Sequence, residues 1–331
     1  MRAFWPIIVV VAALAVVPLL IHSNVVLNFL VVALLIALAG QGWNILGGYG
    51  GQYSFGHAAF FGTGAYATAI LQLHYGVNAW IGFVAGVAAG ALAGAIIGTL
   101  AFRAGLRSSY FALVTLAFAE VLRILASVAP ITGAGVGLLV KLDLRAQAFQ
   151  FQSRAIFYLV ILALVAVSLV LAQWLERSRF GVWLIAVREN EDAAMALGVD
   201  AFAVKLGAMV LSAAITAAAG GFYVQYFLFI DSGIAYGTWI SIEALLTAII
   251  GGVGTVFGAL VGALVVKSLG EGIKFVTGDA PGLDLMLYGA VLILVIRFAP
   301  RGLVGAILDA RARLARRLAA AKAPAGEAVH G

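Results

Sequence analysis

The stretch GGYGGQYSFGHAAFFGTGAY, residues 47–66, joins one long apolar run of the chain, 25–46, to the next, 57–74. It contains seven glycines together with Gln52, Ser54 and His57. A helix needs roughly 20 mainly apolar residues to cross the hydrocarbon core of a bilayer, so runs of this length predict membrane spans. Irregular, polar backbone at membrane depth is tolerated only where protein or a water-filled cavity covers it. The stretch therefore predicts a polar break inside a helical membrane bundle.

The composition excludes an ordinary soluble protein. Across 331 residues the chain is 64% hydrophobic and 10% charged, with a mean hydropathy of +1.11, whereas soluble domains carry about a quarter charged residues. Cysteine is absent, which excludes disulfides, thiolate metal sites and cysteine nucleophiles, and the four histidines have no metal-ligand spacing. The net charge of +6 comes from arginines beside apolar runs. Because no basic stripe with interleaved aromatics is present, we expect no nucleic-acid partner.

The apolar runs predict an all-α, polytopic transmembrane helix bundle of about ten spans. The first run is longer than the apolar region of a signal peptide and lacks a small-x-small cleavage site, so we expect it to be retained. Glycines between Gly251 and Gly258 interrupt the pair of runs at 240–275. In chain order the candidate spans are 4–22, 25–46, 57–74, 79–102, 109–128, 155–175, 204–226, 240–255, 256–275 and 283–299.

The distribution of basic residues predicts the orientation. With the N-terminus inside, most Lys and Arg residues fall on the cytoplasmic side, and the opposite side holds mainly Lys141, Arg145 and Arg154. This asymmetry follows the positive-inside rule and requires an even number of spans, with both termini cytoplasmic. The predicted organisation is a transmembrane domain, 1–305, followed by a basic cytoplasmic tail, 306–331.

The segment 176–205 is the longest charged stretch between two spans. Within it, Asp192, Ala193 and Ala194 suit the start of a helix and Gly198 suits its end. The segment predicts a short, exposed helix. It is either an ordinary amphipathic connector or a surface that serves something outside the bilayer.

Several polar residues fall inside candidate spans or in the break between two of them. Gln52, Ser54 and His57 either line a solute path or hold a tight turn between helices. Glu120 and Arg123 lie three residues apart and can share a helix face. Charges at that depth are costly, so the two residues form either a structural pair or a functional site, and Glu243 leaves the same alternatives open.

Glycine also repeats along the chain. Gly82, Gly86, Gly90, Gly94 and Gly98 recur every four residues and put small residues on one helix face, which predicts close helix packing. A faint internal repeat relates GGYG at 47–50, with Phe-Gly at 55–56, to GGVG at 251–254, with Phe-Gly at 257–258.

The acidic-Ala-Ala-x3-Gly pattern of residues 192–198 is similar to the EAA signature of ABC importer permeases, with Asp192 in place of glutamate. From about residue 40 to 305 the chain resembles the branched-chain amino acid ABC transporter permease family, in particular the longer of its two permease paralogues. The pieces that carry this resemblance are SFGHAAFFGTGAY (54–66), YFALVTLAFAEVLR (110–123), SRFGVWLIAVRENEDAAMALGVD (178–200), SIEALLTAIIGGVGTVFGALVGA (241–263) and PRGLVG (300–305).

The resemblance implies a permease subunit of an importer in the bacterial inner membrane, which translocates branched-chain or related small amino acids by alternating access. It also implies a second, homologous permease subunit, two cytoplasmic ATPase subunits and an extracytoplasmic solute-binding protein. The residues that it assigns to ATPase coupling are Glu189, Glu191, Asp192, Ala193, Ala194 and Gly198.

The chain is not expected to be an enzyme or to hold a cofactor. The run GALVVKS, residues 262–268, has Val266 where a phosphate loop has glycine before its lysine, and no strand precedes it. ATP would therefore be bound by the partner subunits. Two alternatives remain open: an ion-coupled secondary transporter of a small solute, with Glu120 as its coupling carboxylate, and an ABC permease for urea or short amides.

Overall fold

The computed structural model describes residues 4–21, 23–106 and 108–277, and beyond them 286, 289–290, 293, 297 and 302–305. Most of the candidate span 283–299 and all of the tail 306–331 lie outside these residues, so both stay predictions.

The described chain is almost entirely helical, which confirms the predicted all-α class. The helices are α1 (Trp5–Leu20), α2 (Asn24–Trp43), η1 (Asn44–Tyr49), α3 (His57–Tyr75), α4 (Ala79–Arg103), α5 (Ser108–Val128), η2 (Pro130–Thr132), η3 (Ala146–Ala148), α6 (Arg154–Leu175), α7 (Arg179–Glu189), α8 (Glu191–Ala196), α9 (Ala201–Phe227), α10 (Ser232–Tyr236), α11 (Thr238–Gly251) and α12 (Gly258–Thr277). One two-stranded antiparallel ribbon pairs β1 (Leu138–Leu139) with β2 (Phe229–Ile230).

Six helical segments of the described residues are long and apolar enough to cross a membrane: Asn24–Tyr49, Ala79–Arg103, Ser109–Val128, Arg154–Leu175, Ala201–Phe227 and Ser232–Gly251. The sequence predicted about ten spans. Part of the difference is physical, because α1 is a shorter apolar helix of 16 residues. In addition, α3 carries two histidines, two threonines and Gln72, and α12 carries Lys267, Glu271 and Lys274.

Helices α3, α4 and α9 form the most closely packed part of the bundle. A Cβ atom added at Gly90 or Gly94 of α4 would overlap the side chain of Ala217 or Ala213 on α9. On the other side of α9, a Cβ added at Gly220 would overlap the carbonyl oxygen of Phe61 on α3. The glycine stripe of α4 is therefore a packing surface, as predicted.

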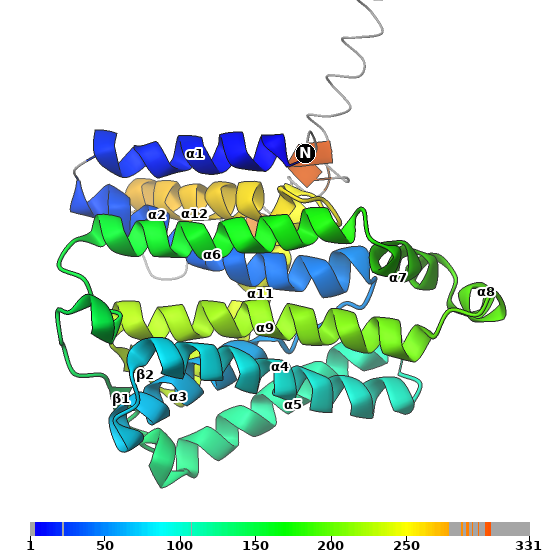
Figure 1. Ribbon diagram of the computed structural model, residues 1–331, viewed down its shortest axis with the longest axis horizontal. Helices are drawn as coiled ribbons and strands as arrows, with labels where there is room; N and C mark the ends of the chain where they lie inside the picture. The colour runs from blue at the N-terminus through cyan, green and yellow to red at the C-terminus, as the bar shows by residue number, and fades with distance from the viewer. Residues whose placement is uncertain are drawn as a thin grey trace, which may run out of the picture.

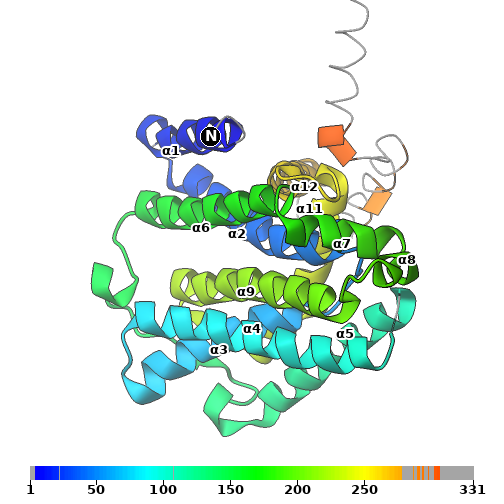
Figure 2. The ribbon, with the colours of Figure 1, turned by 45° about the vertical axis from the view of Figure 1, so that its right-hand side comes forward.

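The bundle has two distinct ends. Figure 1 shows α7 and α8 projecting at one end, whereas β1 and β2 lie at the opposite end. The ribbon, with the register Leu138 to Ile230 and Leu139 to Phe229, ties the α5–α6 connection to the end of α9. Helix α1 stands at the edge of the bundle beside α6 (Figure 2). The order of the helices thus places the 176–205 segment at the α7–α8 end.

Candidate functional site

The predicted polar break is present where α2 meets α3. Helix α2 continues into a π-helical turn, η1, and the chain then runs without regular structure until α3 begins at His57. Gly51 has a φ of +66°, a conformation that favours glycine over residues with a side chain. Single π-helical turns inside α-helices often occur at functional sites. Residues 44–56, called the 44–56 break below, are therefore the first part of the candidate site.

A second break faces the first. Helix α11 ends at Gly251, Gly252 has a φ of +133°, and α12 begins at Gly258. Residues 252–257 are called the 252–257 turn below. A Cβ added at Gly48 would lie 2.7 Å from the backbone nitrogen of Gly254. The two segments that form the internal sequence repeat, GGYG and GGVG, are thus in contact.

Two amide side chains of α2 and η1 join the breaks. Asn44 Nδ2 donates to the Thr255 carbonyl at 2.9 Å, and Asn44 Oδ1 accepts from the Gly254 amide at 2.8 Å. One turn earlier, Gln41 Nε2 donates to the Val256 carbonyl at 3.2 Å. Buried amides of this kind require partners. Backbone groups of the 252–257 turn supply them for Asn44 and for the Gln41 amide nitrogen, whereas Gln41 Oε1 has no partner among the described residues. These three hydrogen bonds make the two breaks one polar unit.

The 176–205 segment is bonded to this unit at two points. Arg188, near the end of α7, donates from Nη1 to the Gly48 carbonyl at 2.9 Å. The Tyr49 hydroxyl donates to Glu176 Oε1 at 2.9 Å. Each bond has one charged partner, the Arg188 guanidinium or the Glu176 carboxylate, and such bonds are stronger than neutral ones. The projecting segment and the interior break are thereby joined directly.

Four residues of this unit were not predicted as site residues from the sequence: Gln41, Asn44, Tyr49 and Arg188. Arg188 was counted only among the basic residues that set orientation. A usable signal was present for Gln41 and Asn44, because they are amide side chains at the end of an otherwise apolar run, directly before the glycines. Such residues inside a span call for a partner in the bundle.

The predicted short helix exists, as α8, but it starts earlier than expected. Asn190 is its N-cap, with Oδ1 accepting from the Ala193 amide at 2.9 Å, whereas the sequence placed the start at Asp192. Asparagine is a better N-cap than the glutamate that follows it. Gly198 has a φ of +88° and ends the helix as predicted.

The coupling residues named by the resemblance fall into two groups. Ala194 is only 3% exposed and packs inside the chain, and Glu191 forms an ion pair of 2.5 Å with the buried Lys205 of α9. These two residues attach α8 to the bundle. The outward group comprises Glu189, Asp192, Ala193 and Gly198, and beside them lies Leu197, which is 87% exposed. A partner would meet this second group.

Of the polar residues predicted at the 44–56 break and the start of α3, Ser54 and His57 are buried and Gln52 is half-buried. His57 Nε2 and Ser212 Oγ of α9 lie 2.9 Å apart, and both side chains are fully buried. Ser54 Oγ accepts from the Gly56 amide at 3.1 Å, and the half-buried Gln52 reaches the Gly50 carbonyl at 3.4 Å. These contacts are those of a tight turn fixed between helices. A role in a solute path stays a prediction for all three residues.

The charged residues predicted inside spans are paired. On α5, Arg123 donates from Nε and Nη2 to the two carboxylate oxygens of Glu120 at 2.8 and 2.6 Å. Glu243 of α11 accepts from Lys267 of α12 at 2.8 Å. The second pair is largely covered, whereas the first lies on the outer face of α5. Within the described residues, no three His, Asp or Glu side chains are placed to hold a metal ion.

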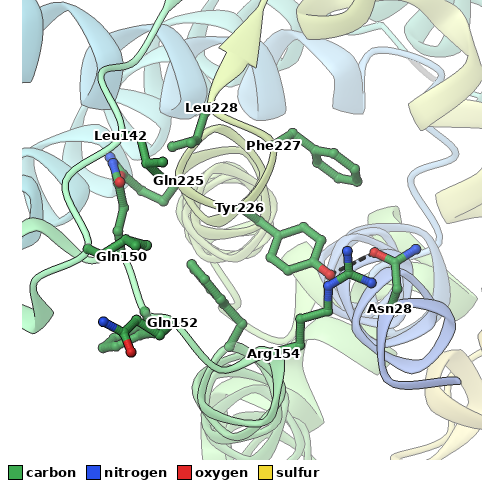
Figure 3. Close-up of a pocket in the computed structure, with 12 residues that line it drawn as sticks. Asn28, Leu142, Gln150, Gln152, Arg154, Gln225, Tyr226, Phe227 and Leu228 are labelled. Atoms are coloured by element: carbon green, nitrogen blue, oxygen red, sulfur yellow. Dashed lines mark hydrogen bonds between the residues drawn. The ribbon is translucent and has the colours of Figure 1, made fainter. Parts of the chain in front are cut away.

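A cavity of about 370 Å³ opens at the other end of the bundle (Figure 3). Arg154 Nη1 donates to the Asn24 carbonyl at 2.9 Å, and the Tyr226 hydroxyl donates to Asn28 Oδ1 at 2.7 Å. The main polar groups of this cavity therefore already tie α6 and α9 to the start of α2. Its wall is lined by Asn28, Leu142, Leu144, Gln150, Phe151, Gln152, Arg154, Phe157, Gln225, Tyr226, Phe227 and Leu228.

The loop beside this cavity carries an exposed ion pair. Arg145 Nε donates to Asp143 Oδ1 at 2.6 Å, and a second guanidinium nitrogen contacts the other carboxylate oxygen. This hydrogen bonding holds the pKa of the Asp143 carboxyl below its ordinary value and raises the pKa of Arg145. The pair stays charged at neutral pH and fixes the loop locally.

The fold and the two joined breaks indicate the class of protein to which the chain belongs. Spans interrupted in corresponding places, with irregular backbone kept inside the bundle, are typical of multi-pass membrane transport proteins. The family described as "Branched-chain amino acid transport system / permease component" matches residues 25–296. The chain belongs to this family, which confirms the resemblance stated from the sequence, and it is a permease subunit, as its relatives are components of transport systems.

The similar proteins that carry names are branched-chain amino acid transport permeases, in agreement with the family. The chain is 28% identical over 296 residues to the "High-affinity branched-chain amino acid transport system permease protein LivM" of Escherichia coli strain K12, covering 81% of this chain and 67% of the relative. The protein of the same name from Salmonella typhimurium strain LT2 gives the same values. The "Probable branched-chain amino acid transport permease protein LivH" of Methanocaldococcus jannaschii is 30% identical over 155 residues, or 45% of this chain and 46% of the relative. No solved structure matches the chain.

Proposed function

We propose that this chain is one of two permease subunits of an ABC importer that carries branched-chain or related small amino acids across the bacterial inner membrane. Two cytoplasmic ATPase subunits bind and hydrolyse ATP, and an extracytoplasmic solute-binding protein delivers the solute. The names of the relatives support the solute class. This chain supplies the path and the coupling surface and holds no cofactor of its own.

The proposed orientation puts the α7–α8 end in the cytoplasm, with both termini on the same side and about ten spans in all. The positive-inside pattern of the sequence supports it. The exposed residues of the 176–205 segment then face the ATPase subunits, whereas the β1–β2 end and its cavity face the solute-binding protein.

The direct bond between Arg188 and Gly48 is the observation that carries the mechanism. Movement of α7 and α8, driven by closure of the ATPase subunits, would act on the 44–56 break through Arg188 and Tyr49. Because Asn44 joins that break to the 252–257 turn, both interruptions would move together. This geometry is suited to alternating access, in which one rigid part of a transporter moves against another.

The outward tip of α8 provides the test of this function. We expect Leu197→Asp to reduce both retention of the ATPase subunits by the purified complex and solute-stimulated ATP hydrolysis. A charge would replace an apolar side chain that is 87% exposed on this chain and would be buried against a partner. The measurement is ATPase content and hydrolysis in the complex purified from membranes.

The matched control is Leu142→Asp, the same change at a leucine that is 67% exposed at the other end of the bundle. It should leave ATPase retention at the wild-type level. Equal retention and hydrolysis in the Leu197→Asp and wild-type complexes would remove α8 as the coupling surface.

The ion-coupled alternative depends on Glu120. A coupling carboxylate must take up and release a proton, but both oxygens of Glu120 accept from Arg123. We therefore expect Glu120→Gln to slow uptake without abolishing it, because the amide oxygen still accepts one bond from Arg123. Uptake into vesicles with ATP inside, with and without a proton gradient, measures this. Complete loss of uptake in a variant that folds and keeps its ATPase subunits would favour the ion-coupled reading.

The solute can be identified separately. An importer of urea or short amides would share this architecture, because in this family the specificity for the solute lies largely in the binding protein. Calorimetric titration of the partner binding protein with leucine, isoleucine, valine, urea and acetamide would separate these solutes. Binding of the amides alone would contradict the amino-acid assignment.

A further inference from the structure

Helix α5 is the least covered of the six candidate membrane spans. Only 28% of its apolar window is buried inside the described chain, against 39% to 67% for the other five. It lies at the outer boundary of the bundle in both views (Figures 1 and 2). A long, apolar helix that contributes this little to its own bundle has a wide surface left for another occupant.

The outward face of α5 is a defined stripe. Leu113, Ala117, Ile124 and Val128 recur at intervals of four or seven residues, so they lie on one side of the helix, and all four are exposed. These four residues with Glu120 and Arg123 are called the α5 face below. Glu120 and Arg123 sit at one edge of this stripe.

The ion pair makes the α5 face unlike the other exposed helix surfaces. The Glu120 and Arg123 side chains are 45% and 38% exposed. The other charged side chains within the six candidate spans are either better covered, at 6% for Lys205 and 24% for Glu243, or stand at the end residue of a span, as Arg103 and Arg154 do. Partly exposed charges toward the middle of a span are costly in lipid. Lipid is therefore a poor occupant for this face.

Water is also a poor occupant, because the stripe beside the pair consists of apolar side chains. A protein helix can satisfy both parts, with small and apolar residues against the stripe and a polar side chain beside the pair. The two hydrogen bonds to Glu120 use two of the five guanidinium N–H donors of Arg123. Donors of the same group can therefore reach across to a neighbour.

We propose that the α5 face is the surface on which the second permease subunit docks. The inference rests on the proposed function, because that function supplies the only partner that lies within the bilayer. The ATPase subunits and the binding protein are soluble and meet the two ends of the bundle. The partner's helix presents apolar side chains to Leu113 and Ile124 and a polar group at the depth of Glu120.

The test is site-specific photocross-linking in the complete complex in native membranes. Benzoylphenylalanine replaces Ile124, which is 50% exposed on the α5 face, and in the control it replaces Val170, which is 43% exposed on α6. Helix α6 lies on the far side of α9 from α5 (Figure 1). We expect an adduct with the second permease subunit at Ile124 and none at Val170. Adducts with lipid alone at Ile124, or equal permease adducts at both positions, would overturn the proposal.

A second variant tests the ion pair without a probe. Glu120→Leu combined with Arg123→Leu makes the face wholly apolar, which suits lipid but removes the polar contact with a partner. We expect loss of the second permease subunit from the purified complex while the variant chain still inserts and stays monodisperse. Unchanged retention would overturn the role of the pair.

Failure of the docking proposal can be distinguished from failure of the proposed importer function. If the wild-type complex contains ATPase subunits and a second permease but Ile124 does not reach that permease, the docking surface is wrong and the importer function stands. If wild-type membranes yield no ATPase subunits at all, the importer function itself fails, and the docking proposal fails with it.

Discussion

Replacing Gly90 by leucine is expected to abolish accumulation of the folded chain. A Cβ atom alone at this position would overlap the Cβ of Ala217, and the carbonyls of Phe60 and Ala213 lie just beyond it. Overpacking of a core costs about 1–3 kcal/mol even where the neighbours can shift. Here the neighbours are helix backbones on two sides, so α4 would be forced away from α9. The yield of monodisperse protein in mild detergent measures the effect.

The control on the same helix is Ala88→Leu, because Ala88 is exposed. It adds the same bulk and hydrophobicity to α4 without meeting α9, and it should keep the wild-type yield. A Gly90→Leu chain that is recovered in normal amounts and retains its partners would show that α4 and α9 need no close approach.

Arg188→Ala is expected to separate ATP hydrolysis from transport. The variant loses the charged hydrogen bond to Gly48, worth about 1.5–3 kcal/mol, and the lower end applies because the Arg188 side chain is 35% exposed. A loss of this size shifts an equilibrium between two conformations by about tenfold. We expect the complex to assemble and to hydrolyse ATP while uptake per ATP falls. Reconstituted proteoliposomes measure both rates.

Arg177→Ala is the matched variant, since Arg177 is an exposed arginine of the same segment. It removes the same charge from the α7–α8 end and should keep the wild-type ratio of uptake to hydrolysis. If Arg177→Ala and Arg188→Ala behave alike, the effect belongs to the surface charge and not to the link with the 44–56 break.

Long apolar runs predicted the fold well because hydrophobicity and length alone specify a span. The run 204–226 corresponds to α9, Ala201–Phe227, and the run 79–102 corresponds to α4, Ala79–Arg103. The run 25–46 was right about α2 but could not reveal the π-helical turn at its end. Asn44, the first residue of that turn, is hydrogen-bonded to the 252–257 turn, and hydropathy carries no information about contacts so distant in sequence.

The candidate site was less predictable, for the same reason. Polar residue types inside spans could be found, and the pairing of Glu120 with Arg123 followed from their spacing of three. The sequence did not show which side of α8 is exposed and which side is buried. Ala194 is small and Asp192 is polar, so either residue type could meet a partner. Ala194 is nevertheless buried, because the chain after α8 folds back and the Val199 amide donates to the Ala194 carbonyl. Only the tertiary arrangement decides which residue faces outward.

The bond partners of Asn44 and Gln41 are 210 to 215 residues further along the chain. During synthesis, α2 therefore leaves the ribosome long before the 252–257 turn exists. Unpaired amides within a membrane span are unfavourable, so the first half of the chain enters the bilayer with a polar defect that is relieved only once the 252–257 turn has been made. Closure of the bundle is thereby delayed until most of the chain has been made, and a chain truncated before residue 254 would keep these amides without their native partners.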